Sequence, residues 1–384
     1  MSSISSSVIR ARVAASTNPA FARHVLRKSL TRHKPQPLTA STAIPRSNIT
    51  TSTSNSIGRM TRSSIRKSST AHMYHDSHSA TIPPQTRLQR PYTFHIGASW
   101  AGKPEYEPSQ SFKIPFPSDT LIGTWRDKTL SRKKAVRSAD AGEDFFFVQE
   151  MRNHSGVSFG VADGVGGWVD SGVDPALFSQ ALMFHAHRYS RNAWAGEPEI
   201  DPTMDYEERE QVEGWEMTPY ECLDLAYGGV LREKSVQAGS STACIISLNA
   251  SSGLLRSAKQ LTKLPANAGR KFSRACVDSP AEADTFEMKL RDGDLVIAYT
   301  DGFSDNVFPS EMVTICSLVA RAGGTEDEQV QAMADRMVEY ARRCMKNKTR
   351  VSPFERDASR QGMYFRGGKE DDVTVIVGLV RETS

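Results

Sequence analysis

The chain of 384 residues has few cysteines and no long apolar run. Its five cysteines are odd in number and widely spaced, and no two of them form a C-x-x-C pair (Cys222, Cys244, Cys276, Cys316 and Cys344). This pattern argues against a disulfide framework and a cysteine-based zinc site, and it suits a reducing compartment. No apolar stretch approaches the roughly 18 residues that a membrane-spanning helix needs, so we expect no membrane span.

Acidic residues are absent from the first 75 positions, which carry twelve Lys or Arg. The formal net charge of +4 is therefore unevenly divided: from Asp76 onward, 36 basic residues face 44 acidic ones, a net of −8. The basic pI belongs to the N-terminal segment alone. A basic pI would favour nucleic-acid binding, but the rest of the chain is acidic, so we predict no nucleic-acid partner.

The N-terminal segment is rich in Ser, Thr, Ala and Arg, the composition of a mitochondrial transit peptide. Val8, Ile9 and Val13 can share one face of a helix with arginines around them. We therefore predict a transit peptide at residues 1–40, read by the mitochondrial import machinery, and a location in the mitochondrial matrix. A disordered Ser/Thr/Pro-rich linker at 41–93 and a folded domain at 94–384 should follow. The alternative for the first segment is a disordered basic tail.

From about residue 94 onward, strand-like and helix-like segments come in runs, which favours an α+β fold with antiparallel sheet faced by helices. Strands are predicted at residues 145–149, 157–162, 241–248, 253–257, 286–290, 295–300 and 373–380. We expect 286–290 and 295–300 to form a hairpin around Asp292-Gly293. Helices are predicted at 176–189, 219–233, 312–321 and 326–344, with the caps Asp174, Thr218 and Thr325.

Acidic residues lie at the ends of four of these strands. They are Glu143 and Asp144, Asp163, Asp301 and Asp305, and the pair Asp371-Asp372. Any one of them alone is more readily a turn residue than a ligand, but four such places together indicate a site. Asp163 is followed by glycines, and Gly164 allows a backbone carbonyl to turn toward the same point. Because the set offers oxygen ligands only, it selects Mn²⁺ or Mg²⁺ over zinc.

Seven short motifs run in order from residue 142 to the C-terminal strand. They are Gly142-Glu143-Asp144, Val161-Ala-Asp-Gly-Val-Gly-Gly-Trp168, Gly172-Val-Asp-Pro-Ala-Leu-Phe-Ser179, Gly239-Ser-Ser-Thr-Ala243, Asp292-Gly-Asp-Leu295, Thr300-Asp-Gly302 with Asp305-Asn306, and Asp371-Asp-Val-Thr374. Together they make the chain resemble the type 2C (PPM) metal-dependent protein serine/threonine phosphatases, and most closely their mitochondrial subgroup.

The resemblance implies a four-layer sandwich of two packed antiparallel β-sheets flanked by helices, with metal ions at one end. Asp163 would bridge two ions, the Gly164 carbonyl would hold one of them, and Asp301 and Asp371 the other. Glu143 and Asp144 would act largely through metal-bound water, and Asp305 would help to hold a third ion. The catalytic residues are then Asp163, Asp301 and Asp371, and the cofactor is two Mn²⁺ or Mg²⁺ ions with room for a third.

By the same resemblance, a hydroxide bridging the two ions would attack phosphoserine and phosphothreonine. The expected partners are phosphorylated mitochondrial proteins, such as enzymes of the matrix or of coenzyme Q biosynthesis. Two residues depart from the family pattern. Val165 stands where many members have a His that has been assigned as the acid for the leaving oxygen. Ala139 replaces a phosphate-binding Arg, and Arg137, or Lys133 and Lys134, are the candidate substitutes.

A larger departure follows Ala258, where about 30 residues of the family pattern are absent. We expect this to remove a central strand pair and one ligand of the third metal. The sequence therefore leaves a second hypothesis open: a catalytically weak or inactive member that binds phosphoproteins or acts as a regulatory partner. A third alternative, a small-molecule phosphohydrolase, shares the same chemistry.

Overall fold

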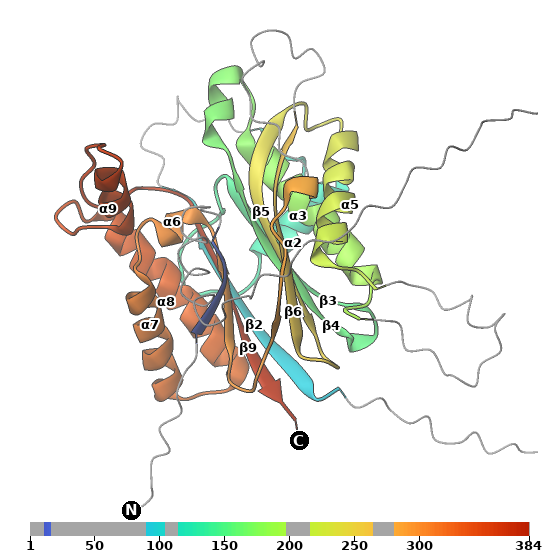
Figure 1. The fold of residues 1–384 in the computed structure, drawn as a ribbon. Helices are drawn as coiled ribbons and strands as arrows, with labels where there is room; N and C mark the ends of the chain where they lie inside the picture. The colour runs from blue at the N-terminus through green and yellow to red at the C-terminus, as the bar shows by residue number, and fades with distance from the viewer. Residues whose placement is uncertain (1–10, 17–89, 104–113, 197–215, 264–279, 384) are drawn as a thin grey trace, which may run out of the picture. The chain divides into compact units, whose positions relative to one another are not determined.

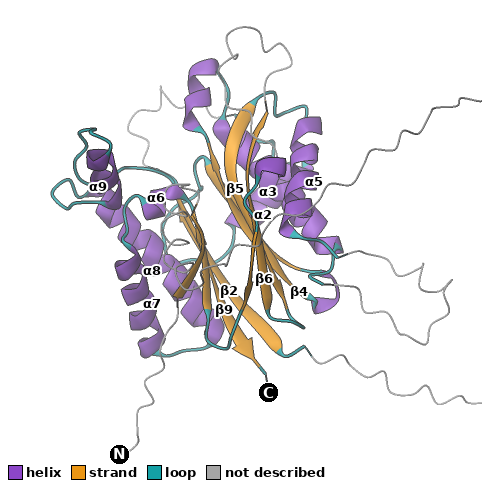
Figure 2. Cartoon of the chain, viewed as in Figure 1, coloured by secondary structure: helices purple, strands orange, loops and turns teal. Residues whose placement is uncertain are grey.

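Two β-sheets with helices on their outer faces make up the described part of the protein (Figures 1 and 2). This computed structural model describes residues 11–16, 90–103, 114–196, 216–263 and 280–383. All of them belong to one unit, formed by 1–27 and 89–384. Cys276, most of the predicted transit peptide and nearly all of the predicted linker lie outside the described residues.

The first sheet has the strand order β1-β8-β9-β2 and the second the order β3-β4-β5-β6-β7. The first sheet consists of β1 (Ala11–Ser16), β2 (Tyr92–Ala101), β8 (Leu295–Tyr299) and β9 (Val373–Glu382). The second consists of β3 (Asp144–Glu150), β4 (Gly156–Gly164), β5 (Gly239–Asn249), β6 (Leu254–Lys263) and β7 (Phe286–Lys289). Pairing is antiparallel except between β1 and β8, which are parallel. The predicted α+β sandwich is confirmed.

Helices cover the outer face of each sheet (Figure 1). Those on the second sheet are α3 (Pro175–Asn192) and α5 (Pro219–Arg232), while α2 (Leu121–Leu130) packs on α3. On the first sheet lies α8 (Glu326–Lys346), with α7 (Pro309–Ala322) packed against it. Two short helices, α6 (Asp301–Ser304) and α9 (Pro353–Arg360), complete this side. In the described part of the chain, no helix is both long and apolar enough to cross a membrane.

The predicted helix caps are confirmed. Asp174 accepts a hydrogen bond from the Ala176 amide and opens α3, with a proline in its first turn. Thr218 and Thr325 form capping boxes with Glu221 and Glu328 at the starts of α5 and α8. These local signals set where the helices begin. The helices α2, α6 and α9 were not predicted, although Ser352-Pro353 with Glu355 gives α9 the same kind of start signal as α5.

Large aromatic side chains fill the space between the sheets and below the helices. Trp100 of β2 and Phe146 of β3 come from opposite sheets, and their ring centroids are 4.8 Å apart. The neighbouring Phe145 points to the other face of its strand and contacts Trp125 of α2. This alternation follows from the two-residue period of a strand. A second apolar cluster joins the first sheet to α7 and α8.

The predicted hairpin of residues 286–290 and 295–300 is wrong. The turn between them exists, since Gly293 has a φ of 75° and the Asp294 amide donates to the Arg291 carbonyl. However, β7 pairs with β6 in the second sheet, whereas β8 pairs with β9 in the first. The chain therefore crosses from one sheet to the other at this turn. Turn residues report a change of direction, and they do not identify the strand that will pair next.

At the junction after Ala258, β6 continues and pairs with β5 as far as Lys263, with a shift in register between Lys259 and Leu261. The second sheet therefore keeps an unbroken strand order, and the absence of the family's additional segment leaves no gap inside it. At the N-terminus, residues 11–16 form strand β1 and not the helical turn that their apolar spacing suggested. Their pairing with β8 does not test the predicted transit peptide.

Candidate metal centre

The register of β3 and β4 brings two acidic residues together. Asp144, the first residue of β3, is paired with Asp163 near the end of β4. The Gly164 amide donates to the Glu143 carbonyl at 3.1 Å, which fixes the strand ends side by side. A side chain at Gly164 would lie 2.6 Å from the Pro175 carbonyl oxygen, so this close approach requires glycine.

Thr300 joins the two sheets at this end of the sandwich. Its hydroxyl donates to Asp144 Oδ2 at 2.6 Å and accepts from the Thr374 amide at 2.9 Å. The next residue, Asp301, begins α6 and brings its carboxylate close to that of Asp163. The two sheets therefore present their acidic strand ends to one another.

Three carboxylates, Asp301 among them, surround the ammonium group of Lys369. Its Nζ lies 3.2 Å from Asp301, 2.8 Å from Asp305 and 2.9 Å from Asp371. These charges outweigh the cost of burial and raise the pKa of Lys369. A cation is thus already held by three of the side chains that the sequence predicts as metal ligands.

Asp372 has a different role from its neighbour Asp371. Its carboxylate is buried and accepts two backbone hydrogen bonds, from the Lys103 amide at 2.7 Å and from the Glu143 amide at 2.8 Å. It therefore holds the loop after β2 against the start of β3. A Cβ at Gly142 would lie 1.9 Å from the Asp372 side chain, which leaves no room for any residue but glycine there.

The cluster carries more negative charge than its surroundings compensate. Burial raises the pKa of Asp163 well above its usual value, and the charges of Asp301 and Asp371 raise it further. Burial and the charge of Asp163 likewise raise the pKa of Asp144. Among the described residues, no partner is found for the buried Asp144 Oδ1. Such groups are costly unless a cation or a proton neutralises them.

A divalent cation fits this environment by three criteria. All the candidate donors are oxygens, one buried carboxylate oxygen has no partner among the residues that the structure describes, and the Lys369 ammonium already occupies the place of a cation. Within the described residues, however, no three Asp, Glu, His or Cys side chains already form a finished ligand set. The residues that would hold an ion are Asp144, Asp163, Asp301 and Asp371, once they turn toward it.

These pKa values predict a pH dependence for the metal-free protein. Burial raises the pKa of both Asp305 and Asp372 to about 6, against an ordinary 3.8. The folded form therefore binds these two protons more tightly than the unfolded form does. The resulting contribution to the free energy of unfolding is fully present below about pH 4, and it is lost as the pH rises through about 6. In EDTA, we expect the protein to lose about 2 kcal/mol, or roughly 5 °C in Tm, between pH 5.5 and 7.5.

Differential scanning fluorimetry at these two pH values measures the effect. Saturating Mn²⁺ is the control, since a bound cation keeps carboxylates ionised and should abolish or reverse the trend. A metal-free Tm that rises from pH 5.5 to 7.5 would contradict the shifts at Asp305 and Asp372.

The other predicted site residues lie as follows. Glu143 is beside the cluster, and its side chain pairs with Lys103 at 3.1 Å. Val165 directly follows β4, is 43% exposed, and donates its amide to the Ser240 carbonyl. Arg137 has an exposed side chain, and its carbonyl accepts a hydrogen bond from Arg342. Among the described residues, Arg137 has no contact with the carboxylate cluster, so its predicted role in substrate binding stays a prediction.

Sequence reasoning missed Lys103, Thr300 and Lys369 as members of this cluster, and it left Asp372 without a role. For Thr300, Lys369 and Asp372 the sequence signal was adjacency to predicted ligands, which by itself does not distinguish a contact from a solvated neighbour. Lys103 lies 40 residues before Glu143 and had no signal, because its contact depends on the register of β2 against β9.

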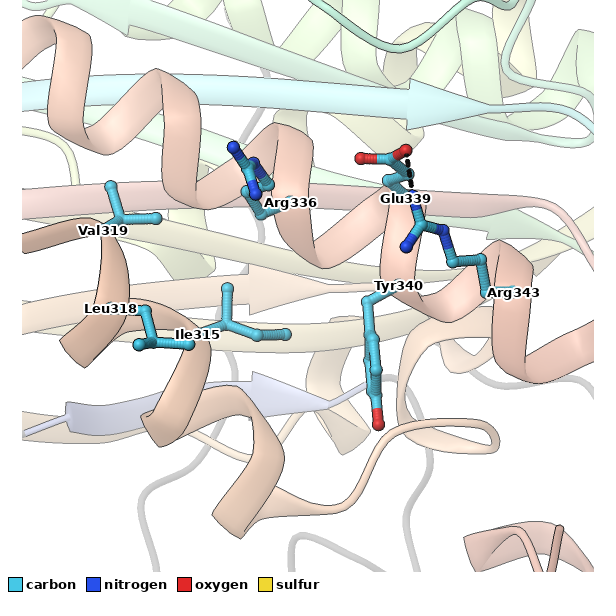
Figure 3. Close-up of a pocket in the computed structure, with 7 residues that line it drawn as sticks. All are labelled: Ile315, Leu318, Val319, Arg336, Glu339, Tyr340 and Arg343. Carbon is cyan, nitrogen blue, oxygen red and sulfur yellow. Dashed lines mark hydrogen bonds and ion pairs between the residues drawn. The ribbon is translucent and has the colours of Figure 1, made fainter. Parts of the chain in front are cut away.

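A pocket elsewhere on the surface has a different character (Figure 3). It lies between α7 and α8, with Ile315, Leu318 and Val319 on one side and Tyr340 on the other. An ion pair between Arg343 and Glu339, at 2.7 Å, borders it. None of the carboxylates described above lines this pocket, so it is unconnected with the candidate metal chemistry.

Comparison with known proteins gives both sequence relatives and structural neighbours. The chain is similar to protein phosphatase PTC7 homolog fig of Drosophila grimshawi, with 33% identity over 290 residues that cover 68% of this chain and 86% of that protein. It is 31% identical to the human protein phosphatase PTC7 homolog over 276 residues, covering 64% of this chain and 82% of that protein.

Among solved structures, the photosystem II phosphatase PBCP aligns with a TM-score of 0.46 and 23% identity, over 75% of this chain and 98% of that one. No family model matches the chain.

Proposed function

Because this chain belongs to the type 2C (PPM) protein serine/threonine phosphatases, we propose that its carboxylate cluster holds two Mn²⁺ or Mg²⁺ ions and that it dephosphorylates proteins in mitochondria. The observation that carries the metal assignment is the buried Asp144 Oδ1, beside the register-paired Asp163, for which the described part of the chain offers no hydrogen-bond partner. A buried carboxylate oxygen in that position destabilises the folded protein unless a cation binds it.

When bound, the two ions would supply a hydroxide near neutral pH and neutralise charge on the phosphoryl oxygens. The protein's own residues position the carboxylates that would hold the ions. Asp163 lies beside Asp144 of its own sheet and close to Asp301, the first residue of α6, and these three carboxylates would hold the ions together with Asp371. Thr300 and Asp372 hold the strand ends in place by hydrogen bonds to Asp144 and to the Glu143 amide. Hydrolysis breaks the bond from phosphorus to the Ser or Thr oxygen, and that oxygen must gain a proton.

Hydrolysis of a phosphoserine or phosphothreonine peptide by the full chain tests this proposal. We expect activity that requires added Mn²⁺ or Mg²⁺ and disappears in EDTA. Activity that persists in EDTA, or no hydrolysis at any metal concentration, would contradict it. A comparison with small phosphorylated metabolites separates a protein phosphatase from a small-molecule phosphohydrolase.

Replacing Val165 with histidine is expected to speed the loss of poor leaving groups. Val165 lies at the surface directly after Gly164. A Cβ on the residue that follows it, Gly166, would lie 2.9 Å from Glu143 Oε2, so this loop borders the cluster. Valine cannot donate a proton, whereas histidine can protonate the Ser or Thr oxygen. We expect kcat for a phosphoserine peptide to rise by about tenfold, below the roughly 100- to 10,000-fold that an evolved general acid contributes.

The matched substrate is p-nitrophenyl phosphate, whose leaving group departs without a proton. Its kcat should change little in Val165→His. Equal increases with both substrates would show that the histidine acts in some way other than proton donation.

A catalytically weak member that binds phosphoproteins is the second candidate, and Val165 is the observation that favours it. The two candidates differ in turnover and not in binding. A wild-type protein that binds a phosphopeptide in Mn²⁺ but does not hydrolyse it would support this second function.

The mitochondrial part of the proposal rests on the composition of residues 1–40. Phosphorylated matrix proteins are then the expected substrates, and enzymes of coenzyme Q biosynthesis are one class of them. A fusion of residues 1–40 to a fluorescent reporter should enter mitochondria, and a cytosolic reporter would contradict the location without affecting the enzyme activity.

A further inference from the structure

Lys103 is held at the edge of the carboxylate cluster by its own backbone. It lies two residues beyond the end of β2, and its amide donates to Asp372 Oδ1 at 2.7 Å. The other oxygen of the same carboxylate accepts from the Glu143 amide at 2.8 Å. Asp372 therefore fixes Lys103 directly beside Glu143 and Asp144, although the chain separates them by some 40 residues.

The ammonium group of Lys103 points toward the cluster and also reaches solvent. Its Nζ lies 3.1 Å from Glu143 Oε2 and 3.9 Å from Asp372 Oδ2, and the side chain is 44% exposed. An ammonium has three N–H donors, and the contact with Glu143 uses one of them. An anion arriving from solvent at the cluster can therefore be bound by the remaining donors.

Two other lysines of this region, Lys369 and Lys134, already have partners of their own. Lys369 is surrounded by three carboxylates. Lys134 donates to the Trp100 and Ser138 carbonyls at 2.8 and 3.1 Å, and it lies 4.2 Å from the centre of the Trp100 ring. Arg137 is exposed and makes a backbone contact with α8. Of these candidates, Lys103 alone combines contact with Glu143 and exposure to solvent.

We propose that Lys103 is the phosphate-binding cation of this enzyme, and that it takes over the task for which Ala139 is unsuited. This inference rests on the proposed phosphatase function. The ammonium contacts a phosphoryl oxygen of the substrate while its backbone stays anchored on Asp372. A lysine binds phosphate as a point charge and lacks the paired donors of an arginine, so its contact is less sensitive to the orientation of the phosphate.

The competing explanation is a purely structural ion pair that neutralises Glu143 and Asp372. The two explanations differ in which quantity Lys103→Ala changes. Loss of a phosphate contact lowers kcat/KM by about 10- to 100-fold and weakens product inhibition by inorganic phosphate to a similar degree. Loss of a structural pair instead lowers Tm or Mn²⁺ affinity and leaves the inhibition constant of phosphate unchanged.

The experiment compares Lys103→Ala, Lys103→Arg and the control Lys128→Ala, an exposed lysine in the last turn of α2. For each full-length protein in saturating Mn²⁺, we would measure kcat and KM for a phosphopeptide, Tm, Mn²⁺ affinity and the binding of inorganic phosphate by calorimetry. We expect weaker phosphate binding and a raised KM in Lys103→Ala, substantial recovery in Lys103→Arg, and no change in Lys128→Ala.

The outcomes separate this inference from the proposed function. If wild type hydrolyses the phosphopeptide and Lys103→Ala binds phosphate equally well, Lys103 has no such role and the phosphatase function stands. If wild type does not hydrolyse the phosphopeptide but loses phosphate binding on Lys103→Ala, the enzyme function fails and the binding role of Lys103 stands.

Discussion

Asp163→Asn is expected to lower metal-dependent hydrolysis of a phosphopeptide by about 1,000-fold, equivalent to about 4 kcal/mol of transition-state stabilisation. Asn keeps the shape of the side chain but removes the negative charge that would attract both ions. The same substitution should raise the Tm of the protein in EDTA. Burial and the charges of Asp301 and Asp371 already raise the pKa of Asp163, so its ionised form is unfavourable in the metal-free protein.

Opposite effects on activity and metal-free stability are the signature of a charged site built to hold a cation. The measurements are phosphopeptide turnover across a Mn²⁺ titration and Tm in EDTA. Asp170→Asn is the matched control, since Asp170 is an exposed acid in the following short helix, Gly166–Ser171, and should change neither quantity. A variant that loses activity together with metal-free stability has unfolded, and retained turnover would remove Asp163 from the metal centre.

Gly302→Ala should produce the second large effect, and for a steric reason. A Cβ at this position would lie 1.9 Å from the Asp372 carbonyl oxygen and 3.3 Å from Asp371 Cβ. Since Gly302 lies in helix α6 with ordinary helical backbone, alanine brings no conformational strain of its own. The added methyl must therefore push α6 away from the start of β9, which separates Asp301 from Asp371.

We expect Gly302→Ala to lose about 3 kcal/mol of unfolding free energy, at the upper end of typical overpacking. Tm should then fall by roughly 6–12 °C, and turnover should fall by about 100-fold because the ligands move apart. Urea unfolding and Mn²⁺ titration measure both effects. Gly167→Ala is the control, because a Cβ there meets nothing within 4 Å. Near-wild-type stability of Gly302→Ala would show that the backbone of β9 can yield.

Much of the fold could be predicted because its signals are local. The strand that carries Asp163 is a short apolar run, and the capping boxes at Thr218 and Thr325 mark two helix starts. The acidic strand ends were also predictable, since each one adjoins such a run. Motif order then linked these acids to one site before any geometry was known.

The errors and omissions concern long-range pairing. The turn at Gly293 was recognised, yet its two strands join different sheets, a choice decided by packing partners far away in the sequence. Lys103 gave no advance sign of its contacts, because an isolated lysine in a loop is ordinarily solvated. Lys369 adjoins the acids at 370–372, but adjacency alone did not show that it contacts them. Asp372 could be placed near the site but not given its task, since its two hydrogen-bond donors lie more than 220 residues earlier.

The anchoring of Lys103 and Glu143 on Asp372 has a consequence for the biosynthesis of this protein. Asp372 lies 229 residues after Glu143, so a growing chain has made β3 long before it makes this carboxylate and the strand β9 that follows it. Until then β2 and β8 lack the strand that lies between them, and the loop of Lys103 has nothing to bind. A growing chain therefore cannot assemble the cluster until β9 has been made, and metal loading must follow that point.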